Sequence, residues 1–143
     1  MKKLIYLFVS ALMLTAFACS TRTEVSPLDD AELAFENGDY DEAQEICDSL
    51  ALGTAGSSLS VDRMCRLSLL LLRLGESYGN EESNIALAAN SFLQAKDRNA
   101  DSVEMFTATL PVEDRARLSL LRAISEAHFA PAITDTIDYE DLE

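Results

Sequence analysis

Hydrophobic residues from position 27 onward recur every three or four positions, which is the spacing of one face of an α-helix. The first helix starts after Ser26-Pro27, an N-cap followed by proline at the first helical position, and stops at Gly38. Its apolar positions are Leu28, Ala31, Ala34 and Phe35. The second helix has its apolar positions at Tyr40, Ala43, Ile46, Cys47 and Leu50. It ends at Gly53, and the segment 54–58, TAGSS, is expected to be a loop.

Residues 60–74, SVDRMCRLSLLLLRL, form the most apolar segment after position 27. Its polar side chains share a narrow stripe, made of Asp62, Arg63, Arg66 and Arg73. A helix that is apolar around most of its circumference is buried on most sides. We therefore expect this helix, closed by Gly75, to be the central element of the fold.

Three further helices are expected after Gly79-Asn80. The first covers 81–97, and its apolar face holds Ile85, Ala88, Ala89 and Phe92. A short helix opens with Asp101 and Glu104 as a capping box and ends before Pro111. The last covers 111–129, with an apolar face of Ala116, Leu120, Ala123, Ile124 and Ala127. No strand-like alternation extends over a useful length, so the chain is predicted to be all-α, with about six helices in antiparallel pairs.

The N-terminus has the pattern of a secretory signal peptide. Lys2 and Lys3 precede an apolar run of about 15 residues, LIYLFVSALMLTAFA, which ends immediately before Cys19. A transmembrane helix needs roughly 20 residues to cross the bilayer core, so the run is short for a retained anchor. Residues 1–18 are therefore predicted to be removed.

The junction Ala18-Cys19 resembles the lipobox of bacterial lipoprotein precursors, although Ala16 and Phe17 depart from that motif. The resemblance implies that Cys19 becomes the first mature residue and carries lipid such as palmitate. Residues 19–26 would then be a lipid-anchored tether at the cell envelope. Ser20 is not the aspartate that signals inner-membrane retention in many lipoproteins, which implies the outer membrane. The alternative is ordinary cleavage after Ala16-Phe17-Ala18, which leaves Cys19 free.

The chain is strongly acidic, with 25 acidic residues, 11 basic residues and a net charge of −14. Loss of residues 1–18 removes two lysines and no acidic residue, leaving nine basic against 25 acidic residues, a net charge of −16. Such a chain is repelled by nucleic acid and by anionic lipid surfaces, so its partners should be neutral or basic. The alternative is that the acidity only keeps an exported protein soluble.

Apart from Cys19, the mature chain has two cysteines, Cys47 and Cys65. An even pair in an oxidising compartment suggests a disulfide. It would close a loop of about 18 residues and contribute on the order of 3 kcal/mol. The alternative is that both are small buried apolar side chains on facing helices.

The densest acidic stretch is ENGDYDEAQEIC, residues 36–47. A calcium loop of the EF-hand kind needs alternating oxygen ligands, a glycine at the sixth position and a glutamate at the twelfth. Here Gly38 precedes the acidic run, and Ala43 stands where a third ligand belongs. A helix corner accounts for Gly38 as a stop and for Asp39 with Glu42 as a capping box. We therefore predict a corner and no metal.

Residues 27–53 resemble a tetratricopeptide repeat. The resemblance rests on Ala31 and Phe35 in the first helix, on the Gly38-Asp39-Tyr40 corner, and on Ala43 where the two helices cross closest. Pro27 replaces the large residue that is common there, and no proline follows the second helix. The later pairs, 60–97 and 101–129, match only in size and apolar pattern. The resemblance implies a helical repeat-like domain over 27–130 with a concave binding face; the alternative is an unrelated helical bundle with one similar corner.

Residues suited to catalysis are sparse. His128 is the only histidine, no second histidine completes a zinc site, and no glycine-rich phosphate loop or G-x-S-x-G elbow occurs. Asp29 and Asp30 are adjacent on a helix and diverge, while Arg122 and Glu126 have the spacing of a surface ion pair. These observations predict a protein that is not an enzyme and has no cofactor.

Two functions remain open. One is a scaffold or adaptor that binds an envelope protein or peptide; the other is a binder of a small ligand or glycan. Sugar sites usually stack rings on tryptophan or tyrosine, but the chain has no tryptophan, and its mature part has only Tyr40, Tyr78 and Tyr139. The scaffold is therefore favoured.

The C-terminal segment 131–143 is expected to be a mobile acidic tail. Pro131 prevents easy continuation of the last helix. Five acidic residues follow among the last nine: Asp135, Asp138, Glu140, Asp141 and Glu143. The tail is either a docking peptide for a basic partner, anchored by Ile133, Ile137 and Tyr139, or a solvated end without a role.

Overall fold

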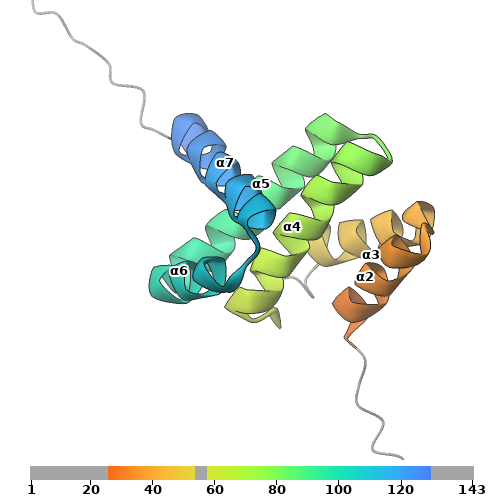
Figure 1. Ribbon diagram of the computed structural model, residues 1–143, viewed down its shortest axis with the longest axis horizontal. Helices are drawn as coiled ribbons and strands as arrows, with labels where there is room; N and C mark the ends of the chain where they lie inside the picture. The colour runs from red at the N-terminus through yellow and green to blue at the C-terminus, as the bar shows by residue number, and fades with distance from the viewer. Residues whose placement is uncertain (1–25, 54–57, 130–143) are drawn as a thin grey trace, which may run out of the picture.

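A computed structural model describes residues 26–53 and 58–129 (Figure 1). The predicted signal peptide, Cys19 and the acidic tail 131–143 lie outside these residues. The described part contains six helices and no strand, which confirms the all-α prediction. The helices are α2 (Pro27–Asn37), α3 (Tyr40–Leu52), α4 (Val61–Ser77), α5 (Glu81–Arg98), α6 (Ala100–Thr109) and α7 (Val112–Phe129). None of them is both long and apolar enough to cross a bilayer.

The first four helices form two antiparallel pairs, α2 with α3 and α4 with α5 (Figure 1). Gly38 turns the chain between α2 and α3 in the left-handed conformation, at φ 81°. Its N–H donates to the carbonyl of Phe35 at 3.0 Å, and the N–H of Asp39 donates to that of Ala34 at 2.9 Å. These bonds satisfy carbonyls at the helix end, so the glycine stop predicted for the first helix is confirmed.

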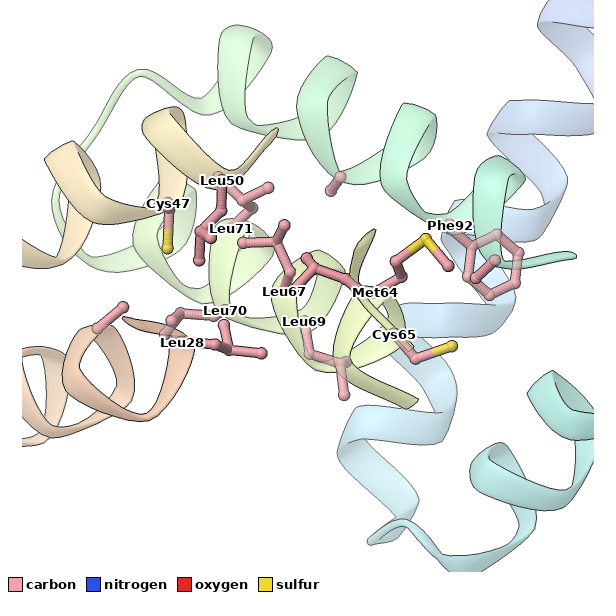
Figure 2. Packing of buried hydrophobic residues seen from close by; sticks show 14 of the residues in the cluster. Leu28, Cys47, Leu50, Met64, Cys65, Leu67, Leu69, Leu70, Leu71 and Phe92 are labelled. Atoms are coloured by element: carbon pink, nitrogen blue, oxygen red, sulfur yellow. The ribbon is translucent and has the colours of Figure 1, made fainter. Parts of the chain in front are cut away.

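Helix α4 lies at the centre of the fold and contacts each of the other five helices, as its apolar sequence predicted. The buried side chains of Leu67 and Leu71 lie between α4 and the helices around it, and Met64 points toward Phe92 of α5 (Figure 2). Leu28 of α2 and Leu50 of α3 complete the core on the other side of α4. One hydrophobic cluster therefore joins both pairs.

Gly75 does not end α4 as expected, because the helix continues to Ser77. This glycine is buried beneath the start of α5. A Cβ atom at position 75 would lie 3.3 Å from the Cα of Glu81 and 3.5 Å from the Cβ of Asn84. Gly75 therefore permits close approach of two helices rather than a turn.

Two predicted caps differ from those observed. Asp39 precedes α3 at φ −86° and ψ 71°, and its side chain makes no capping hydrogen bond. These angles are not the extended ones that aim an N-cap side chain at the first N–H groups of a helix. Helix α6 is capped by Asn99, whose Oδ1 accepts from the N–H of Ser102 at 2.9 Å, so Asp101 lies in the first turn instead.

The predicted buried face of α7 is wrong. The helix buries Asp114, Leu118, Leu121 and Ser125. The predicted face is largely exposed: Ala116, Ala123 and Ala127 face solvent, Leu120 is 62% exposed and Ile124 is half-buried. Apolar residues occur on two sides of this helix, so their spacing did not determine its rotation. The buried Asp114, which pairs with Arg73 of α4 at 2.6 Å, lies on the same inward side as Leu118.

Candidate interaction surfaces

The corner formed by Gly38, Asp39, Tyr40 and Ala43 is a packing element. Ala43 is completely buried. The Tyr40 ring lies 5.3 Å from the Phe35 ring and 6.0 Å from the Tyr78 ring, measured between centroids and in tilted arrangements. Such arrangements are favourable for aromatic pairs. The α2–α3 corner is thus joined to the α4–α5 loop by three rings.

The acidic residues of this corner contribute to the same contact. The Tyr78 hydroxyl donates a hydrogen bond to the carboxylate of Asp41. This bond, together with the negative charge of Asp41, raises the pKa of Tyr78. Among the described residues, which include the whole run 36–47, no three His, Cys, Asp or Glu side chains gather as a metal site requires.

Both described cysteines are free thiols, and each is completely buried. Cys47 belongs to α3 and Cys65 to α4, and the leucines of the core lie between them (Figure 2). The disulfide considered from their spacing is not formed in this structure, which has the alternative arrangement of two small buried side chains. Burial raises the pKa of each thiol to about 12, and neighbouring Asp48 and Asp62 add to the effect.

A polar contact joins α3 to α5 within the interior. Asn84 is completely buried, and its side-chain amide pairs with that of Gln44 through bonds of 2.8 and 3.0 Å. This pair was not predicted from the sequence, although the helical position of Asn84 indicates that its side chain is buried. Asn84 stands four residues before Ala88 and eight before Phe92, so it belongs to the predicted apolar face of that helix.

Ion pairs join α4 to α2. Arg66 contacts Asp29 at 2.6 Å and also pairs with Glu32, to which its Nε donates at 2.9 Å. The hydrogen bond from Arg66 lowers the pKa of Asp29, and the bond to Glu32, with that to Asp29, raises the pKa of Arg66. Arg66 thus holds the first helix to the central one.

A second set of ion pairs joins α4 to α7. Asp114, with its side chain 8% exposed, accepts from Arg73 at 2.6 Å and from Arg117 at 3.0 Å. Arg117 also binds Glu76 through two hydrogen bonds of 2.8 and 3.0 Å. These bonds lower the pKa of Glu76 and raise that of Arg117. The arginine charges on this side of the molecule are therefore matched by carboxylates.

A groove follows α4 between α2 and α6, with a volume of about 150 Å³. Its lining includes Glu32, Arg66, Leu69, Arg73 and Phe106. Its lining comes from α2, α4 and α6, and Asp114 at the start of α7 also belongs to it. Arg66 and Arg73 are already bound to carboxylates of the protein itself. The charged groups that line the groove are therefore largely neutralised by one another.

A smaller and more apolar groove, called here the α7 groove, lies between α7 and the α4–α5 pair. It has a volume of about 80 Å³ and is lined mainly by Leu72, Ile85, Leu120, Leu121 and Ile124. Glu76, Glu81 and Arg117 form its polar edge. The exposed alanines of α7 share a helix face with Leu120, so the groove continues into an apolar strip.

A cleft between α5, α6 and α7, called here the α6–α7 cleft, has a volume of about 310 Å³. Its polar lining consists of Glu104, Thr107, Arg115, Ser119 and Arg122. Arg122 lies 3.9 Å from Glu104. The ion pair expected with Glu126 is not formed, and Glu126 instead pairs with Lys96 at 3.2 Å. Among the described residues Arg115 has no carboxylate partner.

Comparison of the chain with protein-family models, with curated proteins and with solved structures finds no match.

Proposed function

We propose that the protein is a non-enzymatic, lipid-anchored helical scaffold or adaptor that binds a protein or peptide at the bacterial cell envelope, with the outer membrane as its location. The observation that carries this proposal is the apolar outer face of α7, where Leu120 is 62% exposed beside the α7 groove. The inner apolar face of α7 packs in the core, and the folding of the protein explains it. The outer apolar face adjoins a groove and does not contribute to the core, so folding does not explain it.

Contact with a partner accounts for this second face. Contiguous exposed apolar surface next to polar residues marks protein interaction sites, whereas single exposed apolar residues are ordinary. Leu120, Ile124 and Ile85 lie together in this groove, whereas Leu52 at the end of α3 is exposed singly. Transfer of such a surface from water to a partner is favourable by about 25 cal/mol per Å².

The charge around the groove indicates the chemistry of the partner. Glu76 is already bound to Arg117, which also binds Asp114, so these groups neutralise one another. Glu81 on the same edge has no cationic partner among the described residues, and Glu82 beside it is exposed. In a chain of net charge −14, this edge attracts cations. The partner segment is therefore an amphipathic helix with basic and apolar faces.

The predicted lipid anchor at Cys19 fits the proposed envelope location. Helix α2 starts at Pro27, eight residues after Cys19. A tether of that length spans at most about 27 Å. A lipid on Cys19 would hold the helical domain close to the membrane surface and to proteins embedded there.

The test is site-specific photo-crosslinking in cells that make the protein. A photoreactive amino acid at position 120 should give one defined adduct, whose cross-linked peptide in the partner is basic and amphipathic. The matched control is position 52, which is 74% exposed but lies away from the groove. Equal adducts from both positions, or no adduct from position 120, would contradict the proposal.

The alternative is a binder of a small ligand or glycan. Among the described residues its candidate locations are an open hollow of about 360 Å³, lined by Asp62, Ser102, Met105, Phe106 and Thr109, and the α6–α7 cleft. The cleft's volume of about 310 Å³ reaches the lower end of the range for ligand pockets, which begins near 300 Å³. Phe92 is the one aromatic residue of its lining and is only 1% exposed, so no ring face is offered to a sugar there. The scaffold is therefore preferred.

A further inference from the structure

The α6–α7 cleft contains two arginines whose charges are poorly matched. Arg66, Arg73 and Arg117 each have a carboxylate oxygen within 2.8 Å. Arg122 has its nearest at 3.9 Å, and Arg115 has none within 4.0 Å among the described residues. Arg63 at the start of α4 also has no carboxylate within 4.0 Å among the described residues, but it stands alone, whereas Arg115 and Arg122 line the same cleft.

The cleft is suited to an anionic peptide. The lining has two guanidinium groups, Arg115 and Arg122, and one carboxylate, Glu104, so its formal charge is positive. Ser119 and Thr107 add hydroxyl groups, and Leu118 and Phe92 form its buried base. Guanidinium groups bind carboxylates in well-defined geometry, and the apolar base can contact aliphatic or aromatic side chains.

The chain itself provides such a peptide directly after α7. We propose that the acidic segment 131–143 folds back along α7 and places its carboxylates on Arg115 and Arg122 in the α6–α7 cleft. Helix α7 ends at Phe129, and at 1.5 Å per residue Arg122 lies about 10 Å and Arg115 about 21 Å before that end. An extended chain reaches about 3.4 Å per residue, so Asp135, at most about 20 Å from the helix end, is within range of Arg122, and Asp138, at most about 31 Å from it, is within range of both arginines.

The alternative location for the tail is excluded by charge. The α7 groove has Glu81 at its edge, and its arginine is already bound to Glu76 and Asp114. Five further carboxylates are repelled there. The tail therefore covers the side of α7 opposite to the proposed partner groove, and the two proposals stand independently.

The contact is reversible and sensitive to salt. Exposed ion pairs are individually weak, but a short tether gives the tail an effective concentration in the millimolar range. Screening shortens the reach of each charge from about 8 Å at physiological salt to about 3 Å at 1 M. Added salt should therefore release the tail without unfolding the helices.

Tryptophan fluorescence tests the proposal on the whole mature chain. The protein has no tryptophan, so Tyr139→Trp introduces a single reporter in the tail. With the tail in the cleft, the reporter should be shielded from acrylamide. Arg115→Glu with Arg122→Glu should raise its quenching constant by about twofold, and about 1 M sodium chloride should do the same.

Control variants show whether the two cleft arginines themselves hold the tail. Arg63→Glu makes the same kind of charge change at an exposed position near the start of α4 and should leave the quenching constant unchanged. Asp135→Arg with Asp138→Arg, added to the two arginine reversals, should restore shielding. The proposal is overturned if the reporter is as accessible as in a free peptide of residues 130–143, or if it is shielded but indifferent to Arg115 and Arg122.

Discussion

Gln44 and Asn84 exchange two hydrogen bonds between α3 and α5. The Gln44 Nε2 donates to Asn84 Oδ1 at 2.8 Å, and the Asn84 Nδ2 donates to Gln44 Oε1 at 3.0 Å. Each amide nitrogen also has a second acceptor, Asp48 for Gln44 and the Gly79 carbonyl for Asn84. The pair thus joins two helices and fixes the loop between α4 and α5.

The Asn84→Leu variant should lose about 2 kcal/mol of unfolding free energy, because the amide of Gln44 is left without its partner in a partly buried place. The double variant Gln44→Leu with Asn84→Leu should recover part of that loss, since no unpaired amide remains. Urea denaturation of the two single variants and the double variant measures the coupling. Strictly additive effects would show that the pair does not act as a unit.

The Ala43→Leu variant should destabilise the protein by about 1–3 kcal/mol, because residue 43 is completely buried and extra methyl groups must displace its neighbours. Ala86→Leu is the matched control, since Ala86 is exposed in the middle of α5. It should change stability by less than about 0.5 kcal/mol. Thermal unfolding of both variants compares the two positions, and equal effects would contradict close packing at the corner.

Much of the fold follows from local patterns. The boundaries of α2 and α3 depend on Ser26-Pro27 and Gly38, whose effects are confined to a few residues, and these were predicted correctly. The role of Gly75 depends on Glu81 and Asn84 of another helix, so a rule that treats glycine as a stop gave the wrong result.

The candidate surface was less predictable than the fold, because it depends on how α7 is rotated about its axis. Both Leu118 and Leu120 are apolar, and the sequence does not tell which faces inward. The inward side of α7 includes Asp114, whose partner Arg73 lies 41 positions earlier in the chain, so the rotation depends on contacts between distant residues. The α7 groove is exposed because the core packs against the Leu118 side of α7 and leaves the Leu120 side uncovered.

Stability should fall in acid partly through Glu76. Its hydrogen bonds with Arg117 lower the pKa of Glu76, so the pair stabilises the fold above the unfolded value of about 4.3. That contribution is lost as the pH falls through the lowered pKa, where the folded carboxylate becomes protonated. The Glu76→Gln variant should therefore be less stable than the parent at pH 7 and equally stable at the lowest pH.

Urea midpoints measured from pH 7 downward test this dependence. Because Glu76 is half exposed, the difference at pH 7 should stay below about 1 kcal/mol and shrink with added salt. Glu126→Gln is the control, since Glu126 pairs with Lys96 in a more exposed place. A difference for Glu76→Gln that persists unchanged at the lowest pH would contradict the ionic origin of the effect.

Cys47 and Cys65 should be unreactive in the folded protein. Burial raises the pKa of each thiol to about 12, so the reactive thiolate is scarce at pH 8 and reagents cannot reach the sulfur. Ellman's reagent should label neither thiol in the native protein and both after denaturation in urea. Denatured protein without any titratable thiol would show that the pair is bridged when the protein is made in its own compartment.

The Cys19→Ser variant tests the anchor. If lipid on Cys19 holds the protein to the membrane, the variant has no acyl chains to bury, each CH₂ of which is worth about 0.8 kcal/mol. In fractionated cells it should therefore be found either as a soluble unlipidated product or as unprocessed precursor. Mass spectrometry should show a mass without acyl chains in the first case and a mass that includes residues 1–18 in the second. Cys47→Ala removes a cysteine buried in α3 and should leave the protein in the membrane fraction. Mature protein that stays membrane-associated with an unmodified N-terminus would contradict the lipoprotein interpretation, and the envelope scaffold would then need another means of attachment.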